Sequence, residues 1–252
     1  MKTHATFKLS QVYYSMQTEG FTMGKPAIVL MLGGCNLDCT PVHGGDWQCD
    51  VRQLWKRPKK AVVQKVYEHI LKIAPKNTEN ISLVITGGEP LRQQYPIRVL
   101  LNKLQGKFYV ELETNGTIKP DLVADQIDQF NVSPKLPSSG NNYNIYYKER
   151  VIDYLIDECN SHFKFVIAKE SDIEDVYNYY GRHLSRMGKS RIWLMPASTN
   201  QEEFQQKAGM VAELCRVHGF NFSSRLNINI WNNGGSHLYH KFTHQSGILA
   251  KV

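Results

Sequence analysis

Predicted strands and predicted helices alternate along almost the whole sequence. The helical spacing is clearest in residues 61–73, where Val62, Val66, Ile70 and Ile73 recur on one face. Strands separated by helices form βαβ units, whose strands run parallel and whose crossovers are right-handed. The alternation therefore predicts an α/β fold in which a mainly parallel sheet forms an open or partial barrel. The runs predicted as strands are 27–32, 82–86, 108–113, 129–133, 163–168, 191–195 and 225–230, and the other predicted helices lie near 94–104, 121–128, 148–158, 170–187 and 200–217.

Glycine and polar residues follow four of the predicted strands. In parallel α/β folds, chemistry gathers at the carboxyl ends of the strands, which meet at one edge of the sheet. We therefore expect these segments to line one polar pocket. They are residues 33–39, 87–89, 114–116 and 134–135, whereas the polar stretch 136–147 is predicted to be a surface loop.

Three of the five cysteines lie close together, at Cys35, Cys39 and Cys49. In a reducing compartment such a group indicates metal binding or catalysis rather than a disulfide framework. Three local thiolates suit an iron–sulfur cluster that keeps one iron open for a small molecule. A structural zinc site is the alternative, with His43 as its fourth ligand. The two remaining cysteines are predicted to be buried apolar residues.

The formal net charge is +7, and basic residues are dense between positions 52 and 60. A basic face attracts nucleic acid, anionic small molecules or an acidic protein, although a solvated helix start has the same composition. No apolar stretch follows the first ten residues, and the apolar run 27–32 is too short to span a bilayer. We expect a soluble, cytoplasmic protein that does not bind membranes.

The last twenty residues lack a core pattern and contain His237, His240 and His244. These histidines have a spacing that suits a metal site, but an exposed tail or a short amphipathic helix is the simpler interpretation. We therefore predict one domain over residues 1–232 and a C-terminal tail over residues 233–252.

A series of short motifs occurs in one order along the chain. The series comprises QTEG (17–20), GKP (24–26), GCNLDC (34–39), TGGEPL (86–91), ETNGT (113–117), SPK (133–135), FKFV (163–166), MP (195–196) and a serine, arginine, leucine and tryptophan pattern over 223–231. Three cysteines followed by TGGEP resemble the radical S-adenosylmethionine (SAM) superfamily. The whole series resembles the 7-carboxy-7-deazaguanine synthase family within it, over residues 12–231.

This resemblance implies a partial, modified (β/α)6 barrel that is usually a homodimer. It implies a lyase of queuosine biosynthesis that converts 6-carboxy-5,6,7,8-tetrahydropterin to 7-carboxy-7-deazaguanine and releases ammonia. A reduced [4Fe-4S] cluster would cleave SAM to a 5′-deoxyadenosyl radical, with magnesium assisting, while the protein orients and shields this chemistry. The basic stretch after Cys49 would receive an acidic electron donor such as flavodoxin, and nucleic acid is not an expected partner.

The resemblance also implies roles for individual residues. Cys35, Cys39 and Cys49 would hold the cluster. The residues implied for SAM are Gln48, Asp50, Gly87, Gly88, Glu89, Asn115, Ser133, Pro134, Lys135, Met195 and Pro196. Those implied for the pterin are Met16, Gln17, Thr18, Glu19, Met31 and Thr86, with Glu19 and Thr86 as the candidate catalytic residues. A carboxylate such as Glu19 suits a pterin because it accepts two hydrogen bonds from an aminopyrimidine edge.

Several positions depart from the family pattern. Nine residues separate Cys39 from Cys49, where the family has two; longer loops add little closure cost, so cluster binding is still expected. The other departures are Thr18 for glycine, Met31 for the arginine that meets the substrate carboxylate, Val51 for a threonine at magnesium, and Asn227 for histidine. Candidates to replace the lost groups are Thr40 at the metal and a lysine or Arg225 at the carboxylate.

Two further functions stay open. The first follows from the departures, because they concern the substrate end of the site. It is a diverged radical SAM enzyme that acts on a related pterin or purine. The other is a zinc-stabilised, basic nucleic-acid-binding module, which would explain the charge and the cysteines but not TGGEP, ETNG and SPK at successive strand ends.

Overall fold

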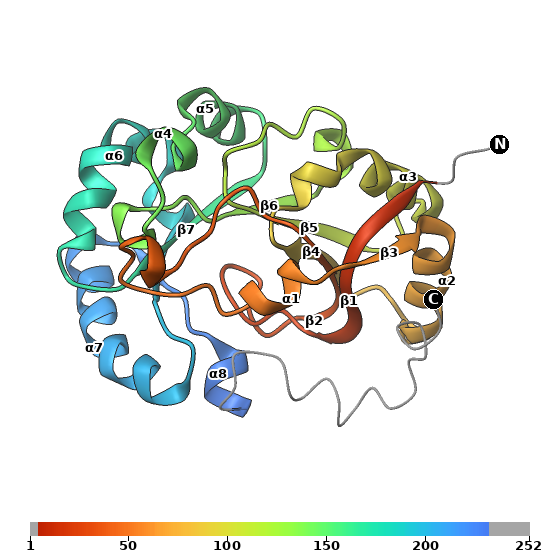
Figure 1. The fold of residues 1–252 in the computed structure, drawn as a ribbon, viewed down its shortest axis with the longest axis horizontal. Helices are drawn as coiled ribbons and strands as arrows, with labels where there is room; N and C mark the ends of the chain where they lie inside the picture. Colours follow the sequence, from red (N-terminus) through yellow and green to blue (C-terminus); the bar gives the residue numbers. More distant parts are fainter. Residues whose placement is uncertain (1–4, 232–252) are drawn as a thin grey trace.

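The computed structural model describes residues 5–231, whose strands form one curved sheet. The strand order is β3-β1-β2-β4-β5-β6-β7-β8-β9 (Figure 1). The strands are β1 (Thr6–Met16), β2 (Pro26–Leu32), β3 (Lys59–Val62), β4 (Ser82–Gly87), β5 (Tyr109–Thr114), β6 (Gln129–Val132), β7 (Ser161–Ile167), β8 (Ile192–Pro196) and β9 (Asn221–Phe222).

Parallel pairing dominates this sheet, as the sequence predicts. Every pair from β2 through β9 is parallel, whereas β1 pairs antiparallel with both β2 and β3. The short connection between β1 and β2, residues 17–25, allows only a hairpin, because a parallel pair needs a long crossover. The expected partial barrel of mainly parallel strands is thus confirmed.

Helices α2, α3, α5, α6 and α7 lie around the outside of the sheet (Figure 1). None of the helices within residues 5–231 has the length and apolarity needed to cross a membrane. The helices are α1 (Arg52–Lys56), α2 (Val63–Ile73), α3 (Gln94–Leu104), α4 (Tyr143–Tyr146), α5 (Glu149–Asp157), α6 (Asp172–Met187), α7 (Gln201–His218) and α8 (Leu226–Trp231).

Alternation along the strands divides apolar from polar side chains. In β5, Val110 and Leu112 belong to the large apolar core, which also contains buried residues of the outer helices. Successive side chains of a strand point to opposite faces, so Glu111 and Glu113 lie on the inner face. The inner side of the barrel therefore carries polar groups, and this is the side on which the pocket opens.

Some sequence predictions are wrong. Residues 226–231 form helix α8 rather than a strand, because β8 already pairs with the two-residue β9 and the chain then turns back across the pocket. The predicted helix 121–128 contains only a 3-10 turn at Ala124–Gln126, since it belongs to a short connection between β5 and β6. Strands β1 and β3 were not predicted, and the predicted loop 136–147 contains α4. The tail 233–252 lies outside the described residues.

Candidate active site

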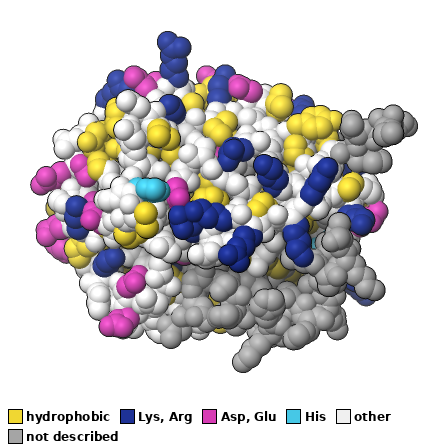
Figure 2. Space-filling model, viewed as in Figure 1, with side chains coloured by type: hydrophobic (Ala, Val, Ile, Leu, Met, Phe, Trp, Pro, Cys, Tyr) yellow, Lys and Arg dark blue, Asp and Glu magenta, His cyan; other side chains and the backbone are white. Residues whose placement is uncertain are grey.

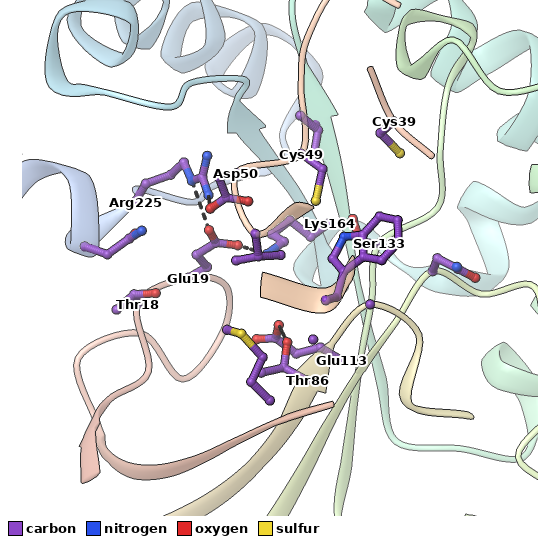
Figure 3. A pocket seen from close by; sticks show the side chains of 18 of the residues that line it. Thr18, Glu19, Cys39, Cys49, Asp50, Thr86, Glu113, Ser133, Lys164 and Arg225 are labelled. Atoms are coloured by element: carbon purple, nitrogen blue, oxygen red, sulfur yellow. Dashed lines mark hydrogen bonds and ion pairs between the residues drawn. The ribbon is translucent and has the colours of Figure 1, made fainter. Parts of the chain in front are cut away.

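A pocket at the carboxyl ends of the parallel strands brings together the cysteines and a group of charged residues. Figure 3 shows Cys39 and Cys49 at one end of it, with Glu19 and Arg225 at another side and Thr86 below. Residues from all parts of the motif series line this pocket. The predicted site residues among them are Met16, Gln17, Thr18, Glu19, Met31, Cys35, Cys39, Gln48, Cys49, Asp50, Thr86, Gly87, Gly88, Asn115, Ser133, Lys135 and Met195.

The long segment between the second and third cysteines folds back so that both reach the pocket. The Cys49 amide donates a hydrogen bond to the Cys39 carbonyl at 3.0 Å, which closes the loop. A 3-10 turn at Pro41–His43 fills the insertion, and the Asp46 amide fastens it to the Ser138 carbonyl at 2.7 Å. The nine-residue segment therefore leaves both cysteines in the pocket lining.

The cysteine end fits a four-iron cluster. Burial raises the pKa of Cys35 to about 11 and that of Cys49 to about 12, so both thiols keep their protons until a metal displaces them. Within residues 5–231, no three His, Cys, Asp or Glu side chains converge on a single ion. A cluster does not require that convergence, because each thiolate binds a different iron.

His43 does not complete a zinc site with these cysteines. Its ring nitrogen lies 3.7 Å from Asp38, its side chain is 53% exposed, and it lies outside the pocket that the cysteines line. The expected alternative of a Cys3His zinc site therefore lacks its fourth ligand in this arrangement.

The TGGEP turn packs directly against the cysteine loop. A Cβ on Gly88 would lie 2.3 Å from the Gly34 carbonyl oxygen and 2.9 Å from the Cys35 amide. A Cβ on Gly87, whose φ is +128°, would lie 2.0 Å from the Leu32 carbonyl oxygen. Glycine is needed here because two backbone segments touch, so the turn and the cysteine loop hold each other in position.

Glu89 lies outside the pocket lining, between the TGGEP turn and the end of β5. The residue is fully buried, and its oxygens accept hydrogen bonds from Thr114 Oγ1 at 3.0 Å, the Asn115 amide at 2.8 Å and the Leu91 amide at 2.9 Å. Desolvation by this burial raises the pKa of Glu89. The carboxylate therefore joins the ends of β4 and β5, and its expected role toward SAM stays a prediction.

Three other predicted residues also lie outside the pocket lining. Thr40 is buried, and its hydroxyl caps the 3-10 turn by accepting from the Val42 amide at 3.4 Å; its expected contact with a metal stays a prediction. The prolines of the SPK and MP motifs, Pro134 and Pro196, direct the chain at the ends of β6 and β8 while their neighbours Ser133, Lys135 and Met195 line the pocket.

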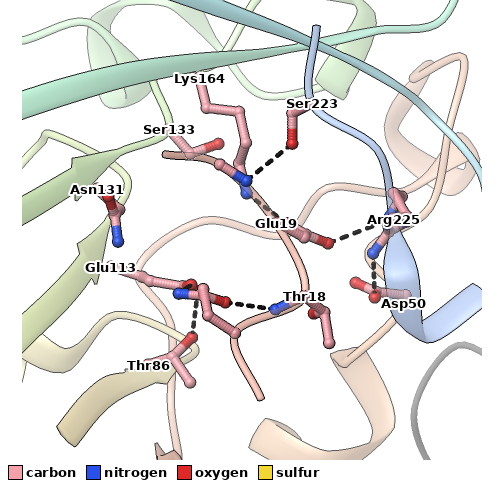
Figure 4. A network of polar contacts seen from close by, with 12 residues as sticks. Thr18, Glu19, Asp50, Thr86, Glu113, Asn131, Ser133, Lys164, Ser223 and Arg225 are labelled. Atoms are coloured by element: carbon pink, nitrogen blue, oxygen red, sulfur yellow. Dashed lines mark hydrogen bonds and ion pairs between the residues drawn. The ribbon is translucent and has the colours of Figure 1, made fainter. Parts of the chain in front are cut away.

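Four charged side chains form a chain of ion pairs across the pocket (Figure 4). Glu19 accepts from Arg225 Nε at 2.9 Å through one oxygen and pairs with Lys164 Nζ through the other. The remaining guanidinium nitrogens of Arg225 donate to Asp50 and to the Ser198 carbonyl. Arg225 thus links the β1–β2 loop, the cysteine loop and the end of β8.

These ion pairs keep Glu19 ionised. Burial alone would raise its pKa, but the positive charges of Lys164 and Arg225 outweigh that effect and hold the pKa at about 2. The pocket therefore contains a fixed carboxylate between two cations.

The segment after β9 holds the loop that carries Glu19. Ser223 Oγ accepts from the Gly20 amide at 2.8 Å, and the Leu226 amide donates to the Thr18 carbonyl at 3.0 Å. The serine, arginine and leucine of the last motif therefore all form hydrogen bonds with residues 18–20. Their separation in sequence from that loop is why their purpose was not evident before the structure.

Glu113 and Lys164 are pocket residues that were not predicted. Glu113 accepts from Thr86 Oγ1 at 2.6 Å and from Gln17 Nε2 at 3.0 Å, and burial raises its pKa. The signal for both residues was present, since they lie in the ETNG and FKFV motifs and are charged residues inside predicted strands.

Two of the departures from the family pattern lie in an apolar part of the pocket lining. Met31 and Val51 line it together with Leu54 and Trp55, and none of these side chains carries a charge. Arg225 does lie in the pocket, as one of the candidate replacements, but its guanidinium nitrogens are already engaged with Glu19, Ser198 and Asp50.

Known proteins resemble this chain in sequence and in fold. No protein-family model matches the sequence. The 7-carboxy-7-deazaguanine synthase of Halobacterium salinarum is 29% identical over 89% of this chain and 90% of its own length. The synthase of Methanospirillum hungatei is 32% identical over 75% of this chain and 72% of its own length.

Solved structures share the fold at lower identity. QueE from Escherichia coli matches with a TM-score of 0.65 and 21% identity, over 88% of this chain and 95% of that one. An anSMEcpe structure with bound AdoMet and a peptide has a TM-score of 0.51 and 15% identity, over 81% of this chain and 65% of that one. The identity to the curated relatives over most of their length shows that this chain belongs to the 7-carboxy-7-deazaguanine synthase family.

Proposed function

We propose that the chain is a radical SAM lyase that converts 6-carboxy-5,6,7,8-tetrahydropterin to 7-carboxy-7-deazaguanine and releases ammonia. Its curated relatives carry the name of that activity. The observation that carries the proposal is the joint placement of Cys35, Cys39 and Cys49 with Glu19 and Glu113 in one pocket. The pocket thus offers cluster ligands and pterin-binding carboxylates side by side.

The three cysteines would hold a [4Fe-4S] cluster, and Gly87, Gly88, Asn115, Ser133 and Lys135 would hold SAM. When bound, these groups supply the radical that takes a hydrogen atom from the substrate. The chain's own part is to bind and orient: the ion pairs of Glu19 fix an acceptor for the aminopyrimidine edge, and Thr86 and Gln17 fix Glu113 beside it. The apolar side chains of Met31, Val51 and Trp55 in the pocket lining would limit the access of water to a bound substrate.

Magnesium binding, a homodimer and a cytoplasmic location are further parts of this proposal. Asp50 supports magnesium binding best, because its carboxylate lies in the pocket beside Cys49. Five free thiols favour a reducing compartment.

An acidic electron donor such as flavodoxin is the proposed protein partner. Figure 2 shows Lys and Arg side chains gathered over the face that carries α1 and β3. This face lies close to the cluster ligands, since α1 begins at Arg52, three residues after Cys49. An acidic donor docked there would be held by charge near the cluster.

Anaerobic reconstitution tests the activity. The protein is loaded with iron and sulfide and supplied with dithionite, SAM, magnesium and 6-carboxytetrahydropterin, and the products are identified by mass spectrometry. We expect 7-carboxy-7-deazaguanine together with 5′-deoxyadenosine, and neither product from a variant in which the three cysteines are alanine. Deoxyadenosine without the deazaguanine would redirect the substrate to a related pterin or purine.

A further inference from the structure

Lys164 is the pocket cation with the largest share of its donors unused. Arg225 has each of its three guanidinium nitrogens fixed by a hydrogen bond, to Glu19, Asp50 or Ser198, which uses three of its five N–H donors. The Lys135 ammonium donates to the Ser133 carbonyl at 2.6 Å and to its hydroxyl at 2.8 Å. Lys164 donates only to Glu19, and an ammonium has three N–H donors, so two remain for a ligand.

Lys135 and Lys164 lie at different ends of the pocket. The charge of Lys135 acts on Cys35 and Cys39, which places it at the cluster end of the pocket. Lys164 acts on Glu19 and Glu113 instead, at the end proposed for the pterin. Its side chain is 12% exposed and belongs to the pocket lining, so water competes little with a hydrogen bond that it makes to a ligand.

The Lys164–Glu19 pair presents a donor directly beside an acceptor. Arg225 holds the second oxygen of Glu19, so the carboxylate cannot turn away from the lysine. A pterin carries the complementary order on its pyrimidinone edge: the C4 oxygen accepts, and the neighbouring N3–H and 2-amino groups donate. Each carboxylate oxygen accepts two hydrogen bonds, so Glu19 can keep its cations and still accept from the ligand.

We propose that Lys164 is a specificity-determining residue that donates to the C4 oxygen of the substrate while Glu19 accepts from its N3–H and 2-amino groups. This inference rests on the proposed pterin substrate. The Lys164–Glu19 pair would therefore select ligands with an oxygen at position 4, because a 4-amino group would place N–H donors against the ammonium. A site built on a hydrogen bond discriminates strongly against a ligand that leaves its buried group unpaired.

Two ligands that differ only at position 4 test the assignment. Binding of 6-carboxypterin and of 2,4-diamino-6-carboxypteridine is measured by calorimetry on the reconstituted protein with SAM, at a mildly alkaline pH at which the diamino ring is neutral. A hydrogen bond to a charged group is worth about 1.5–3 kcal/mol, which is roughly 10–100-fold in affinity. We expect the wild-type protein to prefer the 4-oxo ligand by about that factor.

The variants test whether Lys164 determines selectivity for the 4-oxo group or only contributes to binding in general. Lys164→Met should weaken 6-carboxypterin binding by roughly tenfold or more and abolish or invert the preference, whereas Lys164→Arg should keep it. Lys119→Met is the matched control, since Lys119 pairs with Asp121 at 3.2 Å away from the pocket. Lys164→Gln serves as the neutral variant if the methionine protein does not fold in a thermal melt.

Two results would overturn the inference, and they differ. A wild-type preference that survives in Lys164→Met or Lys164→Gln removes the role of Lys164 and leaves the proposed function standing. A wild-type protein with cluster and SAM that binds neither pteridine removes the pterin substrate itself, and the inference with it.

Discussion

The Nε atom of Arg225 lies 2.9 Å from a carboxylate oxygen of Glu19, although 206 residues separate the two in the chain. The same guanidinium reaches Asp50, next to Cys49, and the Ser198 carbonyl after β8. One side chain thus joins the substrate loop, the cluster loop and a strand end. Because Arg225 is 6% exposed, these contacts are made where water competes little.

Replacing Arg225 by methionine should destabilise the fold strongly. The change leaves Asp50 without its cation and Glu19 with Lys164 alone. Removing one partner of a buried ion pair costs about 3–5 kcal/mol, because a buried charge is left unpaired. Urea unfolding of the cofactor-free protein, followed by circular dichroism, measures the loss.

Arg216→Met is the matched control for that experiment. Arg216 also pairs with a carboxylate, that of Glu213, but the two side chains are 73% and 58% exposed. An exposed pair adds little to stability, so this variant should unfold almost as the wild type does. Similar losses in both variants would show that Arg225 is not the link between the three segments.

The contribution of Glu19 to stability should depend on pH. Its ordinary pKa of 4.5 applies to the unfolded chain, while Lys164 and Arg225, outweighing burial, hold the folded value at about 2. A lowered carboxylate pKa stabilises the fold fully above pH 4.5, and this stabilisation is lost as the pH falls from 4.5 toward 2. The difference in unfolding free energy between the wild type and Glu19→Gln should therefore be constant near neutrality and shrink in acid. A difference that stays the same down to the lowest pH would contradict the assignment.

Site residues that belong to short sequence motifs could be predicted, whereas residues whose partners are distant in the sequence could not. Cys35, Cys39 and Gly88 were found because each follows a strand in a motif short enough to recognise. Glu113 and Lys164 were missed, because only the register of β5 and β7 shows that these charged residues lie on the inner face. Their charge inside a predicted strand was the available sign.

The errors in the fold have a related cause. Residues 225–230 alternate in the way that strands do, but the sheet edge is already taken by β9, and the segment closes the pocket as α8. The motif of Glu89 does not reveal the partners of its carboxylate, because the hydrogen bonds from Thr114 and Asn115 depend on tertiary packing. Sequence patterns thus located the site, while the partner of each side chain required the structure.

Gly88→Ala should impair the cluster more than the fold. The new Cβ would lie 2.3 Å from the Gly34 carbonyl oxygen and 2.9 Å from the Cys35 amide, so the cysteine loop must shift. We expect less iron per chain after reconstitution, measured by absorbance and iron analysis. Gly209→Ala is the control: it lies in α7 with nothing within 4 Å of the new Cβ, and alanine should stabilise that helix by about 1 kcal/mol. Full iron loading of Gly88→Ala would contradict the tight packing.

Reversing charge near α1 should slow turnover driven by flavodoxin but not turnover driven by dithionite. Arg57 and Lys60 are both exposed; Arg57 directly follows α1 and Lys60 lies in β3, the two elements of the basic face. The test therefore compares Arg57→Glu/Lys60→Glu with the wild type under both reductants. It leaves Lys56 intact, because its ammonium pairs with Asp38 at 3.3 Å inside the cluster loop.

The control reverses two lysines at the opposite end of the strands. Lys103 and Lys107 are exposed and precede β5, whereas the cluster lies beyond the carboxyl ends. Docking through charge is also screened by salt, so rising ionic strength should slow the wild type with flavodoxin and affect the Arg57→Glu/Lys60→Glu variant less. If both double variants slow equally with flavodoxin, net charge rather than a docking face governs the rate; if neither slows, the donor binds elsewhere.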